Sequence, residues 1–179
     1  WENSIPVQGN IMPWQEAIIA AETGGLKLKA VYAEVGSMIK KGQVLAEFDT
    51  ASIQTSLKQQ QAAYQQAKVG LRQASADAAR ARSLKDTGAM SDQQIAQFQY
   101  AEEAAQAAVA AAQTRIDADQ LRLQQSKIIA PDNGLVSVRS ANLGAVVQPG
   151  AELFRIIRDG RLEWRAEIAE QHLPELFTG

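Results

Sequence analysis

Apolar residues recur at helical spacing through residues 50–127, on both sides of one break at residues 84–91. Steps of four and seven residues place such side chains on one stripe of a helix. The alternate heptad positions are mostly small, which lets two helices approach closely. The pattern predicts two antiparallel helices in a coiled-coil hairpin, with arms of about 36 residues or roughly 54 Å. The stripe comprises Ile53, Leu57, Tyr64, Leu71, Ala78, Ile95, Val109, Ile116 and Leu123, and the small positions are Ala67, Ala74, Ala81, Ala105 and Ala112.

The break carries the signals of a helix end followed by a helix start. Glycine is the residue that most readily adopts the left-handed conformation past a helix C-terminus, and Gly88 stands in that place. Ser91 is expected to cap the second helix, because Gln94 three residues later completes a capping box. Met90 and Ile95 have the spacing of a hydrophobic staple. The sequence therefore predicts the turn of the hairpin at Gly88, Ala89 and Met90.

Short apolar groups separated by Gly and Pro flank the helical stretch and predict strands. The segment after the helices repeats the segment before them. Gly25-Leu26 matches Gly134-Leu135, the pair Gly36 and Gly42 matches Gly144 and Gly150, and Leu45 and Phe48 match Leu153 and Ile156, with a one-residue gap after the first glycine. A repeat split by a helical insertion indicates two half-motifs that pair into one small β-sandwich. A final strand at residues 162–168 needs a partner, so the two chain ends are expected to meet in part of a second β domain.

Composition narrows the functional classes. The 179 residues carry a net charge of -2, and no basic block interleaved with aromatic residues is present, so nucleic-acid binding is not expected. The chain has no cysteine, which excludes disulfides, cysteine-ligated metal and thiol catalysis. His172 is the only histidine, and the three methionines are widely spaced. We therefore expect no catalytic residues, no metal site and no cofactor.

The repeated half-motif resembles the lipoyl or biotinyl domain. In carriers of that fold the modified Lys lies in the hairpin between the halves, but the corresponding residues 48–52 contain no Lys. The resemblance implies an α+β fold in which a long antiparallel coiled-coil hairpin is inserted between two halves of a lipoyl-like β-sandwich. The expected domains are a partial β-barrel at residues 1–20 and 159–179, the lipoyl-like domain at residues 21–49 and 128–158, and the hairpin at residues 50–127.

This combination is similar to the periplasmic adaptor (membrane fusion protein) family of tripartite efflux pumps, of the resistance-nodulation-division (RND) type. Adaptors that dock onto TolC-type channels carry an Arg, a Leu four residues later and a Ser seven after that, and here these are Arg80, Leu84 and Ser91. Residues 127–134 resemble the family's Ala-Pro-x-x-Gly exit. Glu170 and Leu173 resemble its Glu-x-x-Leu element, although Ala169 replaces the usual Pro.

The resemblance implies a non-enzymatic periplasmic protein that self-associates into a ring, commonly a hexamer. It would link an inner-membrane RND transporter to a TolC-type outer-membrane channel through Arg80, Leu84 and Ser91. An anchor to the inner membrane is expected in an N-terminal segment absent from this chain. The alternatives are an adaptor of an ATP-driven exporter for macrolides or type I secretion, a lipoylated or biotinylated carrier subunit, and a passive coiled-coil scaffold. The Gln-rich arms are expected to be hydrated, or to contact neighbouring copies in a ring.

Overall fold

The computed structural model describes residues 8–85 and 88–167. The chain forms two compact units, one of residues 49–126 and one of residues 1–48 together with residues 127–179. In the described ranges the first unit contains both helices and the second contains the strands. The helical unit is therefore inserted between two segments of the β unit. Within the described ranges, neither helix is long and apolar enough to cross a lipid bilayer.

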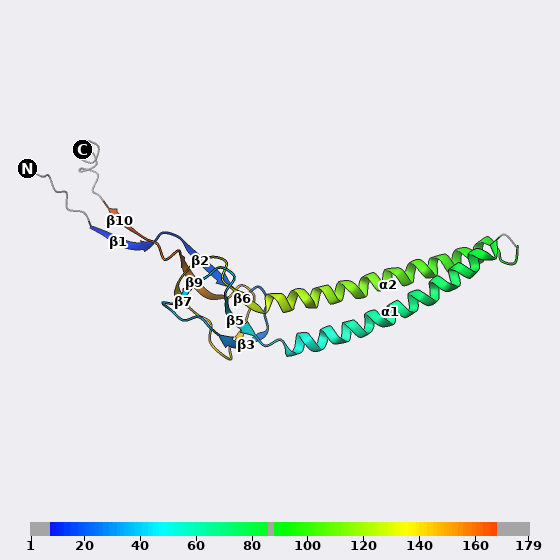
Figure 1. The fold of residues 1–179 in the computed structure, drawn as a ribbon, viewed down its shortest axis with the longest axis horizontal. Coiled ribbons are helices and arrows are strands. Elements are labelled where there is room, and N and C mark those ends of the chain that lie inside the picture. The colour runs from blue at the N-terminus through cyan, green and yellow to red at the C-terminus, as the bar shows by residue number, and fades with distance from the viewer. Residues whose placement is uncertain (1–7, 86–87, 168–179) are drawn as a thin grey trace, which may run out of the picture. The chain divides into compact units, whose positions relative to one another are not determined.

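The helical unit consists of α1 (Ala51–Ser83) and α2 (Asp92–Gln125), which run side by side (Figure 1). They are antiparallel, because Ser56 near the start of α1 contacts Asp119 near the end of α2. The side chains of the predicted stripe are all buried or half-buried. The helices are shorter than predicted, at 33 and 34 residues, since Thr50 is the N-cap of α1 and Lys127 already belongs to a strand.

The β unit contains two four-stranded sheets, with strand orders β2-β9-β7-β4 and β6-β5-β3-β8. The first segment contributes β2 (Glu16–Ala20), β3 (Leu26–Val31), β4 (Met38–Ile39) and β5 (Val44–Phe48). The second contributes β6 (Lys127–Ile129), β7 (Gly134–Arg139), β8 (Val146–Val147) and β9 (Glu152–Arg158). One core contains side chains from both sheets, including Leu28, Leu45, Val136 and Phe154. Each sheet includes strands from both segments, so neither segment could complete its sheet alone.

The internal repeat is visible in the strands. β7, β8 and β9 begin 108 residues after β3, β4 and β5 respectively (26 to 134, 38 to 146, 44 to 152). The glycines at 36, 42, 144 and 150 all have positive φ. The predicted one-residue gap is wrong, because Gly134 corresponds to Leu26 rather than to Gly25. Gly25 has φ 74° in a turn, whereas a Cβ on Gly134 would lie 2.5 Å from the Ile157 carbonyl oxygen.

A separate two-stranded sheet joins β1 (Gln8–Pro13) to β10 (Leu162–Glu167) in antiparallel register. Ile11 lies opposite Trp164 in this sheet. The described segments nearest to the two chain ends therefore pair, as the sequence predicts. The strand was predicted to include Ile168, and this residue lies outside the described residues.

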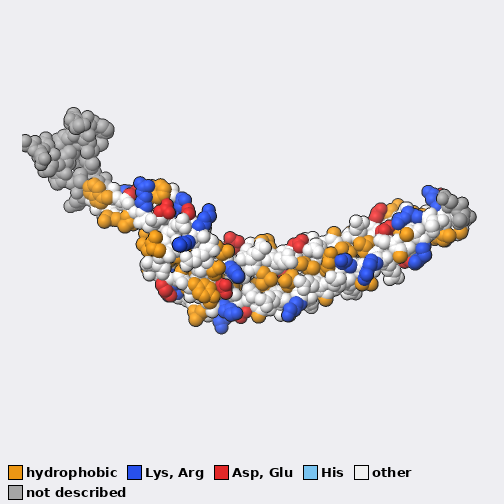
Figure 2. Space-filling view, viewed as in Figure 1, with side chains coloured by type: hydrophobic (Ala, Val, Ile, Leu, Met, Phe, Trp, Pro, Cys, Tyr) orange, Lys and Arg blue, Asp and Glu red, His pale blue; other side chains and the backbone are white. Residues whose placement is uncertain are grey.

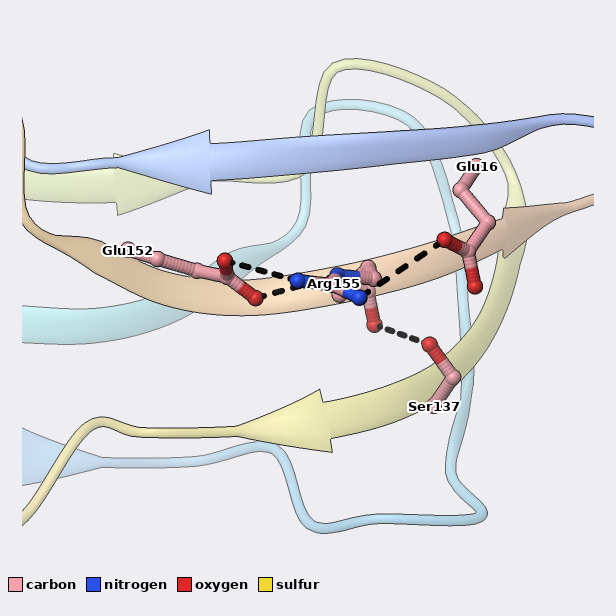
Figure 3. A network of polar contacts seen from close by, with 4 residues as sticks. All are labelled: Glu16, Ser137, Glu152 and Arg155. Carbon is pink, nitrogen blue, oxygen red and sulfur yellow. Dashed lines mark hydrogen bonds and ion pairs between the residues drawn. The ribbon is translucent and has the colours of Figure 1, made fainter.

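A polar network around Arg155 links three strands of the first sheet (Figure 3). Its guanidinium donates to Glu152 at 2.9 and 3.1 Å and lies 3.8 Å from Glu16 of β2. The Ser137 hydroxyl of β7 donates to the Arg155 carbonyl oxygen at 3.1 Å. The hydrogen bonds to Glu152, together with the charges of Glu152 and Glu16, raise the pKa of Arg155. The network therefore ties β2 and β7 to β9 through a permanently charged side chain.

Candidate functional site

The candidate site is the tip of the helix pair, which we define as residues 77–85 and 88–95. α1 ends at Ser83, whose hydroxyl donates to the Arg80 carbonyl at 2.8 Å. Leu84 is the C-cap, with φ -89°, and its N–H lies 3.2 and 3.3 Å from the carbonyls of Ala81 and Arg80. The sequence predicts Gly88 at the C-terminus of the first helix, but α1 ends at Ser83 with Leu84 as its C-cap, so the helix ends earlier than predicted. Gly88 does adopt the left-handed conformation, with φ 71°.

The start of α2 is capped as predicted. The Ser91 hydroxyl accepts a hydrogen bond from the Gln94 N–H at 3.3 Å, and the Gln94 side-chain oxygen accepts from the Ser91 N–H at 3.0 Å. This reciprocal pair is a capping box and satisfies two backbone donors that the helix leaves open. Ile95 is only 5% exposed, and Met90 is half-buried. The turn geometry is therefore specified by residues on both of its sides.

The three predicted docking residues are exposed. Arg80 lies in the last turn of α1, Leu84 is the C-cap of α1, and Ser91 is the N-cap of α2. The Arg80 side chain is 72% exposed and forms an ion pair with Asp77 one turn earlier. Leu84 is 39% exposed, and Ser91 is exposed while it caps α2. Asp86, the other acidic residue close enough in sequence to pair with Arg80, lies outside the described residues. The tip thus presents a cation, an apolar side chain and a hydroxyl to solvent.

A second ion pair near the tip joins the helices and was missed at the sequence level. Arg82 of α1 donates to Glu102 of α2 at 2.9 Å. Hydrogen bonds from Arg82 and Ser75, together with the charge of Arg82, lower the pKa of Glu102. Glu102 looks like a solvated residue in the sequence, and only the antiparallel register brings it to Arg82. This pair holds the end of α1 against α2.

A shallow groove of about 220 Å³ lies between the helices just below the tip. It is lined by Gly70, Gln73, Ala74, Asp77, Phe98 and Ala101. Small residues on both helices leave this space open, and Phe98 remains 38% exposed. In the face drawn in Figure 2, hydrophobic side chains are interspersed with polar and charged ones along the helices.

At the other end of the helix pair, a carboxylate is buried between the helices. Asp119 is 6% exposed, and the Ser56 hydroxyl donates to it at 2.6 Å. Arg122 lies 4.0 Å from the same carboxylate. The sequence places Asp119 close to the apolar stripe but does not reveal its partner.

The described residues contain no group of three or more His, Asp or Glu side chains able to hold a metal ion. His172, Ala169, Glu170 and Leu173 lie outside those residues.

No family model matches the chain. The nickel-cobalt-cadmium resistance protein NccB of Alcaligenes xylosoxydans xylosoxydans is 28% identical over 181 residues, covering 97% of this chain and 43% of NccB. The multidrug resistance protein MdtA of Yersinia pestis (strain Pestoides F) is 28% identical over 142 residues, covering 79% of this chain and 32% of MdtA. The chain thus spans less than half the length of these curated relatives.

Three solved structures share the fold. The membrane fusion protein Spr0693 of Streptococcus pneumoniae R6 has a TM-score of 0.70 at 18% identity, over 93% of this chain and 69% of Spr0693. A MacA-MexA chimera with the Pseudomonas aeruginosa MexA α-hairpin domain scores 0.58 at 24% identity, over 93% and 54% of the two chains. The periplasmic adaptor protein EmrA scores 0.52 at 13% identity, over 94% and 80%.

The chain resembles periplasmic adaptor, or membrane fusion, proteins. The resemblance inferred from the sequence is therefore confirmed. The docking residues Arg80, Leu84 and Ser91 were predicted from a three-residue pattern, and the cap at Ser91 was predicted from its own local signal. Asp77 lies three residues before Arg80, and the sequence indicates it as a partner of that residue. Glu102 and Asp119 were missed as partners, because the antiparallel register of the helices assigns their contacts.

Proposed function

We propose that this chain belongs to a non-enzymatic periplasmic adaptor of a tripartite multidrug efflux pump. It would link an inner-membrane RND transporter to a TolC-type outer-membrane channel as a ring of copies, expected to be six. The proposal assigns α1 and α2 to a coiled-coil hairpin inserted between the halves of a lipoyl-like sandwich, and β1 and β10 to an incomplete β-barrel. The likeness to adaptor proteins over nearly the whole chain supports it.

The observation that carries the docking role is the exposure of Arg80, Leu84 and Ser91 at the tip. Arg80 keeps 72% of its side chain in solvent even though it pairs with Asp77, so free N–H groups remain for carbonyls or carboxylates of a partner. Leu84 offers an apolar contact of the kind that fills a groove between partner helices. The Ser91 hydroxyl accepts from the Gln94 N–H and donates to the Gln94 side-chain oxygen at 3.1 Å, so one lone pair remains for a donor of the partner. Docking that favours an open channel state would act by population shift.

Binding of the purified chain to a detergent-solubilised TolC-type channel tests this proposal. Arg80→Asp and Leu84→Ser are each expected to weaken binding by about 30-fold, the effect of losing one strong interface contact. Lys68→Asp is the matched control, because it makes the same charge change at an exposed position of α1 outside the tip. All variants should keep wild-type helicity by circular dichroism. Equal binding by wild type, both tip variants and the control would refute docking through the tip.

The class of transporter is a separate part of the proposal. Co-purification with an RND transporter, compared with a macrolide-type or type I ATP-driven exporter, measures it directly. Retention of the RND transporter alone is the expected result. Retention of an ATP-driven exporter alone would replace that part of the proposal and leave the tip experiment unaffected.

A further inference from the structure

The predicted docking residues come from both helices, so their arrangement depends on how α1 and α2 are aligned along their common axis. Arg80 and Leu84 lie at the end of α1, whereas Ser91 begins α2. Residues 85–90 connect the two ends. A loop of this length can join two antiparallel helices at more than one alignment. A contact between the helices near the tip must therefore fix the alignment.

The apolar contacts near the tip hold the helices close together but align them only weakly. Ala78, Ala81 and Ile95 are 0%, 2% and 5% exposed, so the helices pack against each other there. Two of these three side chains are single methyl groups, which have little shape to interlock with the opposite helix. The groove lined in part by Ala74 and Ala101 lies just below and leaves space between the helices. Apolar packing at this end therefore does little to prevent one helix from sliding along the other.

The ion pair between Arg82 and Glu102 opposes such sliding because of its direction. The bond between Ser56 and Asp119 shows which positions face each other across the helices. Counted from that bond, Arg82 is attached about nine residues, or roughly 13 Å, nearer to the tip than Glu102. Side chains slant toward the N-terminus of their own helix, so Arg82 extends away from the tip and Glu102 extends toward it. Their charged groups meet at 2.9 Å, and this oblique link would break if either helix moved along the axis.

The carboxylate of Glu102 is well placed for this link. Its side chain is 24% exposed, whereas that of Arg82 is 47% exposed. Hydrogen bonds from Arg82 and Ser75, together with the charge of Arg82, keep the pKa of Glu102 below its ordinary value, so it stays ionised. Both donors belong to α1. A partly buried carboxylate with two donors on the opposite helix makes a firmer link than a fully exposed ion pair.

Arg80 and Arg82 therefore differ in what they can do, although they are only two residues apart. Arg80 is 72% exposed and pairs with Asp77 on its own helix. A pair within one helix cannot align two helices, and it leaves most of the Arg80 side chain open to a partner. Arg82 instead reaches across to α2. One arginine presents charge to the outside, and the other connects the two helices that carry the docking residues.

We propose that Arg82, Glu102 and Ser75 form an axial brace that aligns α1 and α2 at the tip. The brace positions the docking residues of α1 relative to the docking residue of α2, and its members are positioning residues that need not touch the partner. The inference rests on the proposed function, which supplies the partner, a TolC-type channel. A partner that contacts both helices at once binds best when they are already aligned, because it then does not have to order them.

A double-mutant cycle of binding to a detergent-solubilised TolC-type channel tests the brace. Arg82→Ala and Glu102→Ala are each expected to weaken binding about five-fold, the effect of losing one partly exposed ion pair. The double variant should also be weakened about five-fold, because either substitution alone removes the pair. Single effects that multiply to about 25-fold in the double variant would overturn the brace. Unchanged binding by Glu102→Ala would also overturn it, since Arg82 would then act without its partner.

Three variants control for charge and for stability. Arg72→Ala and Glu103→Ala make the same substitutions at exposed positions that form no ion pair in residues 8–85 and 88–167. Their binding should stay within about two-fold of wild type. Ser56→Ala weakens the helix pair far from the tip and should also leave channel binding unchanged. A loss in Ser56→Ala equal to that in Arg82→Ala would refute positioning, because general stability would then explain both.

The alignment can also be measured without a channel, because the chain contains no cysteine that would take up a spin label. Ala79→Cys and Ala107→Cys place labels at exposed positions of the two helices, well separated along the axis. The distance distribution from pulsed electron paramagnetic resonance should be narrow, and adding Glu102→Ala should broaden or shift it. An identical distribution would overturn the brace. Failure of wild type to bind any channel would instead refute the proposed docking function, and the label distance would still decide the alignment.

Discussion

The buried contact between Ser56 and Asp119 allows a quantitative prediction about the helix pair. Ser56→Ala removes the hydroxyl that donates to Asp119 at 2.6 Å and leaves the 6% exposed carboxylate without that donor. Arg122 cannot replace the donor, because it lies 4.0 Å away and its side chain is 61% exposed. A hydrogen bond to a buried charged group contributes about 1.5–3 kcal/mol. We therefore expect Ser56→Ala to lower the free energy of unfolding by about 2 kcal/mol.

Urea unfolding followed by far-ultraviolet circular dichroism measures this loss, since the helical unit dominates that signal. Ser52→Ala is the control, because it makes the same change at an exposed position of α1 and reports the helix propensity of Ala alone. The double variant Ser56→Ala with Asp119→Leu replaces both polar partners by apolar groups, a change that is close to neutral at many buried sites. We expect it to be more stable than Ser56→Ala.

Two results would refute this reasoning. The first is a Ser56→Ala variant within about 0.5 kcal/mol of the Ser52→Ala control, which would mean that water or Arg122 satisfies the carboxylate. The second is strict additivity of the Ser56 and Asp119 substitutions, because residues in contact should show a coupling energy of about 0.5 kcal/mol or more.

The β unit supports two further predictions. Gly134→Ala should destabilise the unit by about 1–3 kcal/mol in urea denaturation, because its Cβ would lie 2.5 Å from the Ile157 carbonyl oxygen. Gly25→Asn is the contrasting variant. It should be nearly neutral, since Gly25 needs only positive φ and Asn tolerates positive φ. Equal losses in the two variants would contradict this distinction. Hydrogen bonds from Arg158 and from the Asn133 N–H, with the charges of Arg158 and Lys41, lower the pKa of Asp132 below its unfolded value. The stability that Asp132 contributes is therefore present above about pH 4, and it is lost as the pH falls through the folded pKa. The difference in unfolding free energy between wild type and Asp132→Asn should therefore shrink on acidification, and a difference that is constant with pH would rule out this linkage.

Much of the helical unit could be predicted from local signals. The heptad stripe, the break and the cap of α2 depend on residues within a few positions of one another, so the sequence displays them directly. Ser91 and Gln94 are three residues apart and form the predicted capping box. The start of α1 and the end of α2 were not given exactly, because Thr50 and Lys127 are both compatible with a helix. In the structure Thr50 is the N-cap of α1, and Lys127 pairs with Glu47 of β5.

The repeat indicated two related β segments, but it could not predict which strands pair with one another. The two-residue strands β4 and β8 each pair with a strand from the other segment, β4 with β7 and β8 with β3. Such pairing depends on contacts between residues about a hundred positions apart. The wrong alignment of Gly134 also arises from a long-range contact. Strand β9 approaches the backbone so closely that position 134 must be a glycine, whereas no turn requires a glycine there.

The sequence by itself determined the two helices, the cap of α2 and the split repeat, because periodicity, caps and turn residues are properties of short segments. The meeting of the chain ends was inferred differently, from a final strand that needed a partner. Only the tertiary structure decided which charges are paired. Asp119 is bonded to Ser56, Glu102 is bonded to Arg82, and Glu103 and Asp117 form no ion pair within the described residues. These outcomes depend on the antiparallel register of α1 and α2. That register is the sum of many weak contacts along two helices, and no single residue specifies it.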